Sequence, residues 1–275
     1  MRWPRGRVAT SEQRTEEASG IAAFLRTGRS PAAKRLVVCA GDSITSGQNS
    51  ANWVDLLQRR FAADGYQFVN AGADGDPAWN VLQRIDDVVR CQPDAVTLQV
   101  GGNDVAAASG TWQEKMYWRQ QHAPHAPTLG WYTECVDEIL TRLQSQTSAR
   151  IAVLEIPMIG EDLTSETNRR VDSYNRALRR LADAHAAEYL PLHDRLASLL
   201  PASHSPPLYR GRFGPMTRAS LSRSILHRSW DQISASNGLI VLIDHVHLND
   251  RAAMITADLV ADFITGLGRS AEGRR

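Results

Sequence analysis

The 275-residue chain contains few cysteines and no long apolar run. Its three cysteines, Cys39, Cys91 and Cys135, are widely spaced and form no C-x-x-C pair, so we expect neither a disulfide framework nor a zinc knuckle. No stretch approaches the roughly 20 apolar residues that cross a bilayer, and no transmembrane segment is predicted. The basic residues within 1–7 lead into no apolar segment of the signal-peptide type, so we expect a cytoplasmic protein.

Several signatures of other function classes are absent too. There is no Walker loop, no dinucleotide fingerprint and no H-E-x-x-H zinc motif, and the Gly-x-Ser-x-Gly elbow of α/β-hydrolases fails at Thr45. His122 and His125 have no third ligand at a suitable spacing, which favours a loop over a metal site. The net charge of +1 creates no large field toward nucleic acid. We therefore expect no metal, no cofactor and no nucleic-acid partner.

What the sequence does contain is a regular alternation of two kinds of segment. Short, continuously apolar runs are typical of strands buried on both faces, and we predict strands over 36–40, 66–70, 95–100, 151–156 and 188–192. Apolar residues at helical spacing predict helices over 12–26, 53–61, 81–89, 131–143, 171–181 and 249–263. The alternation predicts a parallel sheet with helices on both faces, whose ligands bind at the carboxyl ends of the strands.

Composition divides the chain into a core and several additions. We interpret residues 1–33 as a polar N-terminal appendage, 34–267 as one domain and 268–275 as a C-terminal tail. Within the domain, the insertions 105–130 and 201–230 both follow strand ends, so we expect them near the ligand site.

Aromatic residues are concentrated in and after the first of these insertions. Trp112, Trp118 and Trp131 either line a substrate pocket or pack a helix against the core, and both interpretations stay open at this point.

Four polar segments follow predicted strands or precede the last helix: 41–45, 70–76, 101–104 and 244–249. Ser43 lies at a strand-to-helix turn, where the amides of a helix N-terminus favour negative charge. A serine hydroxyl needs a base to take its proton, and the usual base is a histidine held by a carboxylate. His247 lies three residues after Asp244, a spacing that favours it over its neighbour His245. Because these loops leave one edge of a parallel sheet, they can converge on a single site.

Acyl transfer also needs fixed hydrogen-bond donors for the oxyanion of the tetrahedral intermediate. The backbone amides of Ser43 and Gly75 suit this task, and the side-chain amide of Asn103 is a third candidate. Gly72 competes with Gly75, since either glycine can simply permit a turn. Asp42 either hydrogen-bonds loop amides or contacts the substrate.

Together the four segments resemble the four sequence blocks of the SGNH hydrolases, also called GDSL esterases and lipases, over roughly residues 35–265. The resemblance implies a flavodoxin-like, three-layer α/β/α fold with a five-stranded parallel sheet and no metal. It implies that Ser43 is the nucleophile and that Asp244 and His247 complete a catalytic triad. It also implies oxyanion donors at Gly75, in preference to Gly72, and at Asn103.

Ester hydrolysis through an acyl-enzyme is therefore the leading hypothesis, with small acyl or acetyl esters favoured as the small-molecule substrate. An acyltransferase that uses the same acyl-enzyme is the alternative, and a non-catalytic binding protein on this fold is a third. We expect activity to fall on acidification as His247 protonates, near its ordinary pKa of about 6.5.

Overall fold

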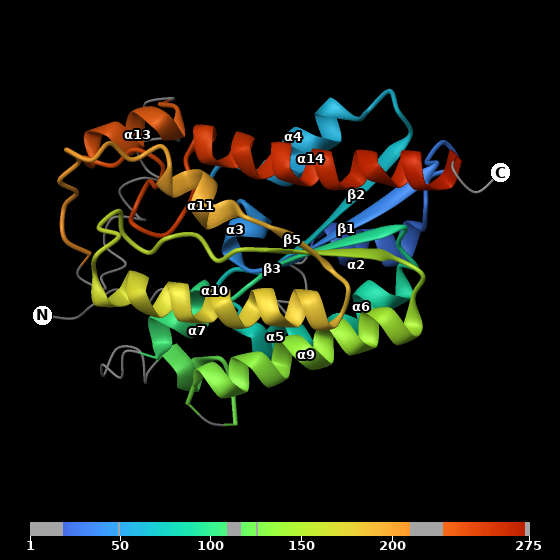
Figure 1. The fold of residues 1–275 in the computed structure, drawn as a ribbon. Coiled ribbons are helices and arrows are strands. Elements are labelled where there is room, and N and C mark those ends of the chain that lie inside the picture. The colour runs from blue at the N-terminus through green and yellow to red at the C-terminus, as the bar shows by residue number, and fades with distance from the viewer. Residues whose placement is uncertain (1–18, 49, 109–116, 125, 210–227, 273–275) are drawn as a thin grey trace, which may run out of the picture.

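Five parallel strands form one sheet with the order β2-β1-β3-β4-β5 (Figure 1). The structure is a computed structural model that describes residues 19–48, 50–108, 117–124, 126–209 and 228–272. Its strands are β1 (Arg35–Gly41), β2 (Tyr66–Gly72), β3 (Ala95–Gln99), β4 (Arg150–Leu154) and β5 (Glu188–Leu190). Every predicted strand is present, and with helices on both faces of the sheet the predicted three-layer α/β/α class is confirmed.

The three central strands, β1, β3 and β4, are buried on both faces, because their side chains alternate between two apolar clusters. In β1, Leu36 and Val38 join one cluster, whereas Val37 and Cys39 join the other. Burial of this strand is nearly complete, which explains why its sequence is continuously apolar instead of alternating with polar residues.

Helices cover the two faces as separate layers (Figure 1). One layer contains α2 (Ser19–Thr27), α5 (Ala78–Gln83), α6 (Ile85–Arg90), α9 (Leu129–Gln146) and α10 (Glu166–Ala184). The other contains α4 (Trp53–Arg60), α11 (Leu192–Ala197), α13 (Trp230–Ser236) and α14 (Asp250–Glu272). Two short helices, α3 (Ser43–Ser46) and α7 (Gly102–Ala107), follow the carboxyl ends of β1 and β3.

The structure extends the domain beyond both predicted boundaries. Helix α2 lies within the predicted appendage 1–33, yet its Ile21 and Phe24 are buried in the apolar core, because residues three apart share one face of a helix. At the other end, α14 continues to Glu272, past the predicted limit at residue 267. Residues 1–18 lie outside the described part of the chain.

The predicted helix over 81–89 is instead two helices, α5 and α6, which meet at Arg84. The backbone of Arg84 leaves the helical region, with φ −116° and ψ 11°. Its guanidinium donates hydrogen bonds to the carbonyl oxygens of Gly41 and Ala71, at the ends of β1 and β2. These long-range contacts explain the break, which helical periodicity did not indicate.

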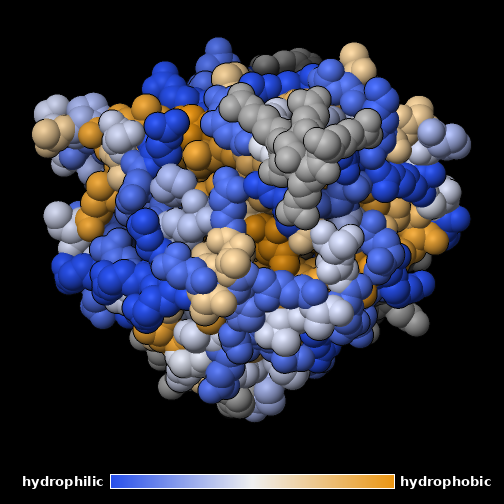
Figure 2. Space-filling view, turned by 45° about the vertical axis from the view of Figure 1, so that its right-hand side comes forward, coloured by the Kyte–Doolittle hydropathy of each residue, from blue (hydrophilic) through white to orange (hydrophobic). Residues whose placement is uncertain are grey.

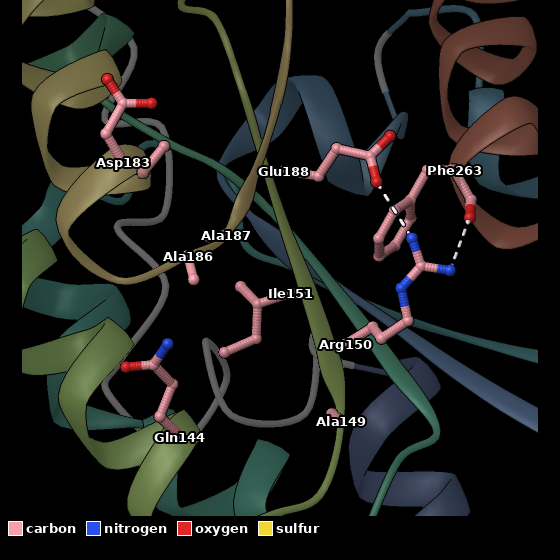
Figure 3. Close-up of a pocket in the computed structure, with 10 residues that line it drawn as sticks. Gln144, Ala149, Arg150, Ile151, Asp183, Ala186, Ala187, Glu188 and Phe263 are labelled. Atoms are coloured by element: carbon pink, nitrogen blue, oxygen red, sulfur yellow. Dashed lines mark hydrogen bonds and ion pairs between the residues drawn. The ribbon is translucent and has the colours of Figure 1, made fainter. Parts of the chain in front are cut away.

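A cavity of about 620 Å³ lies beside the amino-terminal ends of β4 and β5 (Figure 3). Within it, Arg150 donates to the carboxylate of Glu188 at 3.0 Å and its guanidinium lies over the ring of Phe263. The polar segments predicted to carry chemistry follow the opposite, carboxyl ends of the strands, so this cavity is separate from the candidate site.

Hydrophilic residues cover most of the face shown in Figure 2, and hydrophobic residues are visible there mainly in recesses. Among the described helices, none combines the length and the apolar character needed to cross a membrane.

Candidate active site

Ser43 is the first residue of α3, directly after the buried strand β1. Asp42 caps this helix: its carboxylate accepts a hydrogen bond from the backbone N–H of Ile44 at 3.0 Å. The indole N–H of Trp53 donates to the carbonyl of Ile44 at 3.0 Å, which ties the turn to α4. The position of Ser43 is therefore set by the backbone of a short, well-anchored turn.

Three predicted site residues form one hydrogen-bonded chain. The Nε2 atom of His247 lies 2.9 Å from the Oγ atom of Ser43, and its Nδ1 atom lies 2.8 Å from Oδ2 of Asp244. The other oxygen of Asp244 accepts from the backbone N–H groups of Val246 and His247, at 3.1 and 2.8 Å. Asp244 and His247 are both 8% exposed, so water screens this relay only weakly.

The pKa of His247 is the balance of opposing effects. Burial on its own lowers this pKa, but the hydrogen bond and the negative charge of Asp244 outweigh it, so the pKa is raised above 6.5. Burial raises the pKa of Asp244, but the hydrogen bond to His247, the charge of His247 and the hydrogen bonds from two backbone N–H groups together outweigh that effect and lower the pKa below its ordinary value. Asp244 is thus ionised at neutral pH and stabilises the imidazolium form of His247.

Among the described residues, the N–H groups of Ser43 and Gly75 donate no hydrogen bond within the protein. The side-chain amide of Asn103 donates to the carbonyl oxygen of Asp76 at 3.1 Å, which places Asn103 beside the loop that contains Gly75. Ser43 and Asn103 thus lie in the short helices that follow β1 and β3, and Gly75 lies in the loop that follows β2. The catalytic role of these three predicted oxyanion donors stays a prediction.

Gly72 and Gly75, the two competing glycines, are required for different reasons. A Cβ atom at Gly72 would lie 2.2 Å from the backbone nitrogen of Ser46, so only glycine lets β2 approach helix α3 this closely. Gly75 has φ +77°, a left-handed conformation that favours glycine. Gly72 therefore serves packing, and Gly75 remains the candidate donor.

A family model described as the GDSL-like lipase/acylhydrolase family matches residues 39–252. The chain belongs to this family. The matched range includes Ser43, Asn103, Asp244 and His247, so the segments that carried the resemblance lie inside it.

One curated relative of this chain is esterase TesA of Pseudomonas aeruginosa, which is 37% identical over 92 residues. The alignment covers 31% of this chain and 45% of that esterase, so it spans less than half of the relative.

Solved structures with the same fold include the acetyl xylan esterase AlAXEase, with a TM-score of 0.58 and 21% identity, covering 83% of this chain and 99% of that chain. A catalytic variant of Axe2, an acetylxylan esterase from Geobacillus stearothermophilus, matches with a TM-score of 0.60 and 18% identity, covering 83% and 93%.

Arg84 lies at the candidate site, and sequence reasoning missed it. Its Nε atom donates to the carboxylate of Asp76 at 2.8 Å, while its two terminal nitrogens donate to Gly41 and Ala71. The guanidinium thereby joins the end of β1, which leads to Ser43, to the loop that carries Gly75. No local sequence pattern predicts these contacts. Arg84 lies in a segment whose periodicity resembles one continuous helix, and Gly41 and Ala71 are distant from it in the sequence.

Tyr117 is a second residue that the sequence did not single out. Its hydroxyl donates a hydrogen bond to the carbonyl oxygen of Gly75, and it belongs to the predicted insertion 105–130. The insertion therefore holds the loop that contains Gly75, the predicted oxyanion donor.

Replacing Tyr117 with phenylalanine should lower kcat for a simple ester by roughly tenfold with little change in KM. Removing an oxyanion donor outright costs about 10²–10³ in kcat, and Tyr117 acts on such a donor indirectly. Steady-state kinetics of Tyr117→Phe measure the effect. Tyr66→Phe is the control, because the Tyr66 hydroxyl donates to the carbonyl of Ile264 near the amino-terminal end of β2, away from the triad. Wild-type kcat in Tyr117→Phe would contradict the proposed role.

Asp42, proposed from sequence either as a substrate contact or as a partner of loop amides, is 1% exposed and caps α3. Burial raises its pKa to about 7, against the lowering effect of the Ile44 amide. Burial likewise raises the pKa of Asp104 to about 7. The contacts of Asp42 match the amide-bonding alternative, and its contact with substrate stays untested.

The raised pKa of Asp42 predicts a change of stability with pH. Between about pH 4 and pH 7 the unfolded chain ionises Asp42 while the folded protein keeps it protonated, so its contribution to stability falls as pH rises. Asn keeps an N-cap acceptor and does not titrate. Relative to wild type, Asp42→Asn should therefore gain up to about 4 kcal/mol in unfolding free energy across this window.

Urea unfolding at pH 4, 5.5 and 8 measures this difference. Asp162→Asn is the control with the opposite sign, because hydrogen bonds from Thr164 lower the pKa of the exposed Asp162. A pH-independent difference between Asp42→Asn and wild type would refute the buried titration.

Two of the three predicted tryptophans lie within the described residues, and both are buried. Trp118 and Trp131 are buried in the core and pack edge-to-face with ring centroids 5.3 Å apart, and Trp79 packs against Trp131 at 5.5 Å. This packing accounts for their burial, and their part in substrate binding stays a prediction. Trp112 lies outside the described residues.

One group of side chains in the described part of the chain has metal-ligand geometry: Glu155, His193 and Asp194, whose donor atoms lie within 4.8 Å of one another. Glu155 already accepts hydrogen bonds from the hydroxyl of Tyr189 and the backbone N–H of Asp194. Of the two histidines considered from sequence, His122 belongs to no such group and His125 lies outside the described residues.

Proposed function

We propose that this chain is a carboxylic ester hydrolase that acts through a Ser43–His247–Asp244 triad and a covalent acyl-enzyme. The observation that carries the proposal is the continuous hydrogen-bonded chain from Ser43 Oγ through His247 to Asp244 in a member of an acylhydrolase family. This arrangement supplies the nucleophile, the base and the group that orients the base.

The reaction proceeds in two halves. Ser43 Oγ attacks the ester carbonyl while Nε2 of His247 takes the hydroxyl proton, and collapse of the intermediate passes this proton to the departing alcohol. Water then attacks the acyl-enzyme, giving a proton to His247, which returns it to Ser43 as the acid leaves. Asp244 stays ionised throughout and stabilises the imidazolium that forms twice.

The oxyanion of each tetrahedral intermediate is bound by the amides of Ser43 and Gly75 and by the side chain of Asn103. Within the described part of the chain, the N–H groups of Ser43 and Gly75 donate no hydrogen bond, which supports this assignment because donors without another acceptor need no reorganisation when charge develops. The hydrogen bond of Asn103 to Asp76 supports it further, since it orients the amide before substrate binds.

We propose small acyl esters, and acetyl esters first among them, as the substrates. Structural neighbours with this fold include acetylxylan esterases, which supports testing acetylated sugars. The side chains of Trp118 and Trp131 are buried in the core, which leaves less apolar surface near the triad for a long acyl chain.

The test combines an active-site probe with a substrate series. A fluorophosphonate should label Ser43, located by peptide mass spectrometry, and kcat/KM should decrease from p-nitrophenyl acetate to longer esters. An acetylated xylooligosaccharide tests sugar esters in parallel, and added alcohols reveal acyl transfer. An intact protein that neither reacts with the probe nor hydrolyses any ester would refute the function, while a preference for long chains would refute only the substrate class.

A further inference from the structure

Asp244 and His247 lie on a buried loop, over residues 240–249, that belongs to no strand of the sheet. Its local pairing is an isolated antiparallel bridge between Leu242 and Leu248. The carbonyl groups of the loop are bound by neighbouring side chains: Ser234 donates to the carbonyl of Leu242 at 2.7 Å, and Asn237 to that of Ile243 at 2.6 Å. The N–H groups before the triad residues therefore need acceptors that no adjacent strand supplies.

Glu161 supplies those acceptors. Its Oε1 atom accepts hydrogen bonds from the backbone N–H groups of Ile240, Val241 and Leu242, at 2.9, 2.8 and 2.9 Å. Its side chain is fully buried. A single carboxylate thus binds three consecutive amides, the last of which lies two residues before Asp244.

The same segment of the chain contacts the loop at a second point. The N–H of Gly160, which precedes Glu161, donates to the carbonyl of His245 at 2.7 Å. Asn168 holds this turn by donating to the carbonyl of Gly160 at 3.0 Å. The backbone of the triad loop is therefore fixed both before Asp244 and between Asp244 and His247.

The second oxygen of Glu161 reaches the predicted insertion 201–230. Its Oε2 atom lies 2.7 Å from Nε2 of His204. The insertion is thereby attached to the carboxylate that holds the triad loop.

We propose that Glu161 is a positioning residue for ester cleavage, acting through the backbone of the loop that carries Asp244 and His247. This inference rests on the triad proposed above. The carboxylate does not touch the reacting atoms, but it sets the path of the chain that places the imidazole 2.9 Å from Ser43. Without it, the 240–242 amides must find other acceptors, and the loop shifts.

Glu161→Ala should lower kcat by about 10²-fold, the cost expected when a catalytic group moves by about 1 Å, with KM changed less than about threefold. The rate at which a fluorophosphonate inactivates the enzyme should fall in parallel, because this rate reports the activation of Ser43 directly. Glu161→Gln keeps an acceptor oxygen for the three amides, so it should recover kcat to within about tenfold of wild type.

Glu155 offers a matched control. It is also a buried glutamate, 5% exposed, but its carboxylate binds Tyr189 and the amide of Asp194 instead of the triad loop. Glu155→Gln should lower the melting temperature and leave kcat and the inactivation rate near wild type. Circular dichroism verifies folding of each variant, and Glu161→Gln carries the comparison if Glu161→Ala does not fold.

The outcomes separate this inference from the proposed function. Wild-type kinetics in Glu161→Ala, or equal losses of kcat and probe reactivity in Glu161→Ala and Glu155→Gln, would overturn the positioning role. If Glu161→Ala does not fold, wild-type kinetics in Glu161→Gln would overturn it. Glu161 variants that lose kcat and probe reactivity while Glu155→Gln keeps both would support it. Full esterase activity in Ser43→Ala, measured in the same series, would overturn the triad itself.

Discussion

Replacing Ser43 with alanine is expected to lower kcat for ester hydrolysis by about 10⁶-fold, the loss found when a serine nucleophile of a triad is removed. In the proposed mechanism the acyl group is transferred to the Oγ atom of Ser43, and the buried side chains of His247 and Asp244 cannot replace this atom. Residual hydrolysis would come from the oxyanion donors and from substrate binding, which Ser43→Ala leaves in place.

Burst kinetics with p-nitrophenyl acetate measure this prediction. The wild-type enzyme should release p-nitrophenol in a burst equal to the enzyme concentration if deacylation is slower than acylation, and Ser43→Ala should show none. Ser46→Ala is a suitable control, because Ser46 lies one turn later on α3 and its hydroxyl donates to Asp74 and not to His247. A loss of activity of the same size in Ser46→Ala would mean that damage to α3, and not the missing nucleophile, explains the result.

Asp244→Asn is expected to lower kcat by about 10⁴-fold and to move the acid limb of the pH profile. The carboxylate holds His247 in the tautomer that can accept the Ser43 proton, and an amide in its place favours the wrong one. The fold of the loop should survive, since the asparagine oxygen still accepts the N–H groups of Val246 and His247.

The direction of the pH shift follows from the causes of the histidine pKa. In the wild type, Asp244 raises the pKa of His247 above 6.5 against the effect of burial, so kcat/KM should fall as pH drops through a value above 6.5. Asp244→Asn removes that stabilisation of the imidazolium and leaves the burial, so the acid limb should move to lower pH. A plot of log kcat/KM against pH from 5 to 9 measures both enzymes. An acid limb that stays in place would show that Asp244 does not control the titration of His247.

The fold class could be predicted because a strand that is buried on both faces has a continuous run of apolar residues in its sequence. The apolar residues of β1 contribute to two clusters, and the central strands β3 and β4 are buried in the same way. The expected helix over 81–89 was wrong in one respect, since Arg84 interrupts it to bind strand ends far away in sequence. Periodicity reports only neighbours three or four residues apart, so it contains no information about that contact.

The candidate site could likewise be predicted only in part from the sequence. Its residue types could be named because three of the four polar segments follow strand ends and the fourth, which contains Asp244 and His247, directly precedes the last helix. Tyr117 and Glu161 could not be named, since each acts by binding backbone groups that any sequence would offer. The sequence predicted the ordinary pKa of about 6.5 for His247. It could not predict that this pKa is raised, because the direction of the shift depends on the contact with Asp244 in the folded protein.

By itself, the sequence determined the alternation of strands and helices, the family to which the chain belongs and the chemical groups at the carboxyl edge of the sheet. These properties depend on which side chains are apolar and on which polar ones follow each strand. The tertiary structure alone decided that Ser43 and His247, 204 residues apart, lie within one hydrogen bond, and that Glu161, Tyr117 and Arg84 hold the loops around them. The physical reason is that distances and local charge depend on how distant segments pack, and a linear pattern does not contain that packing.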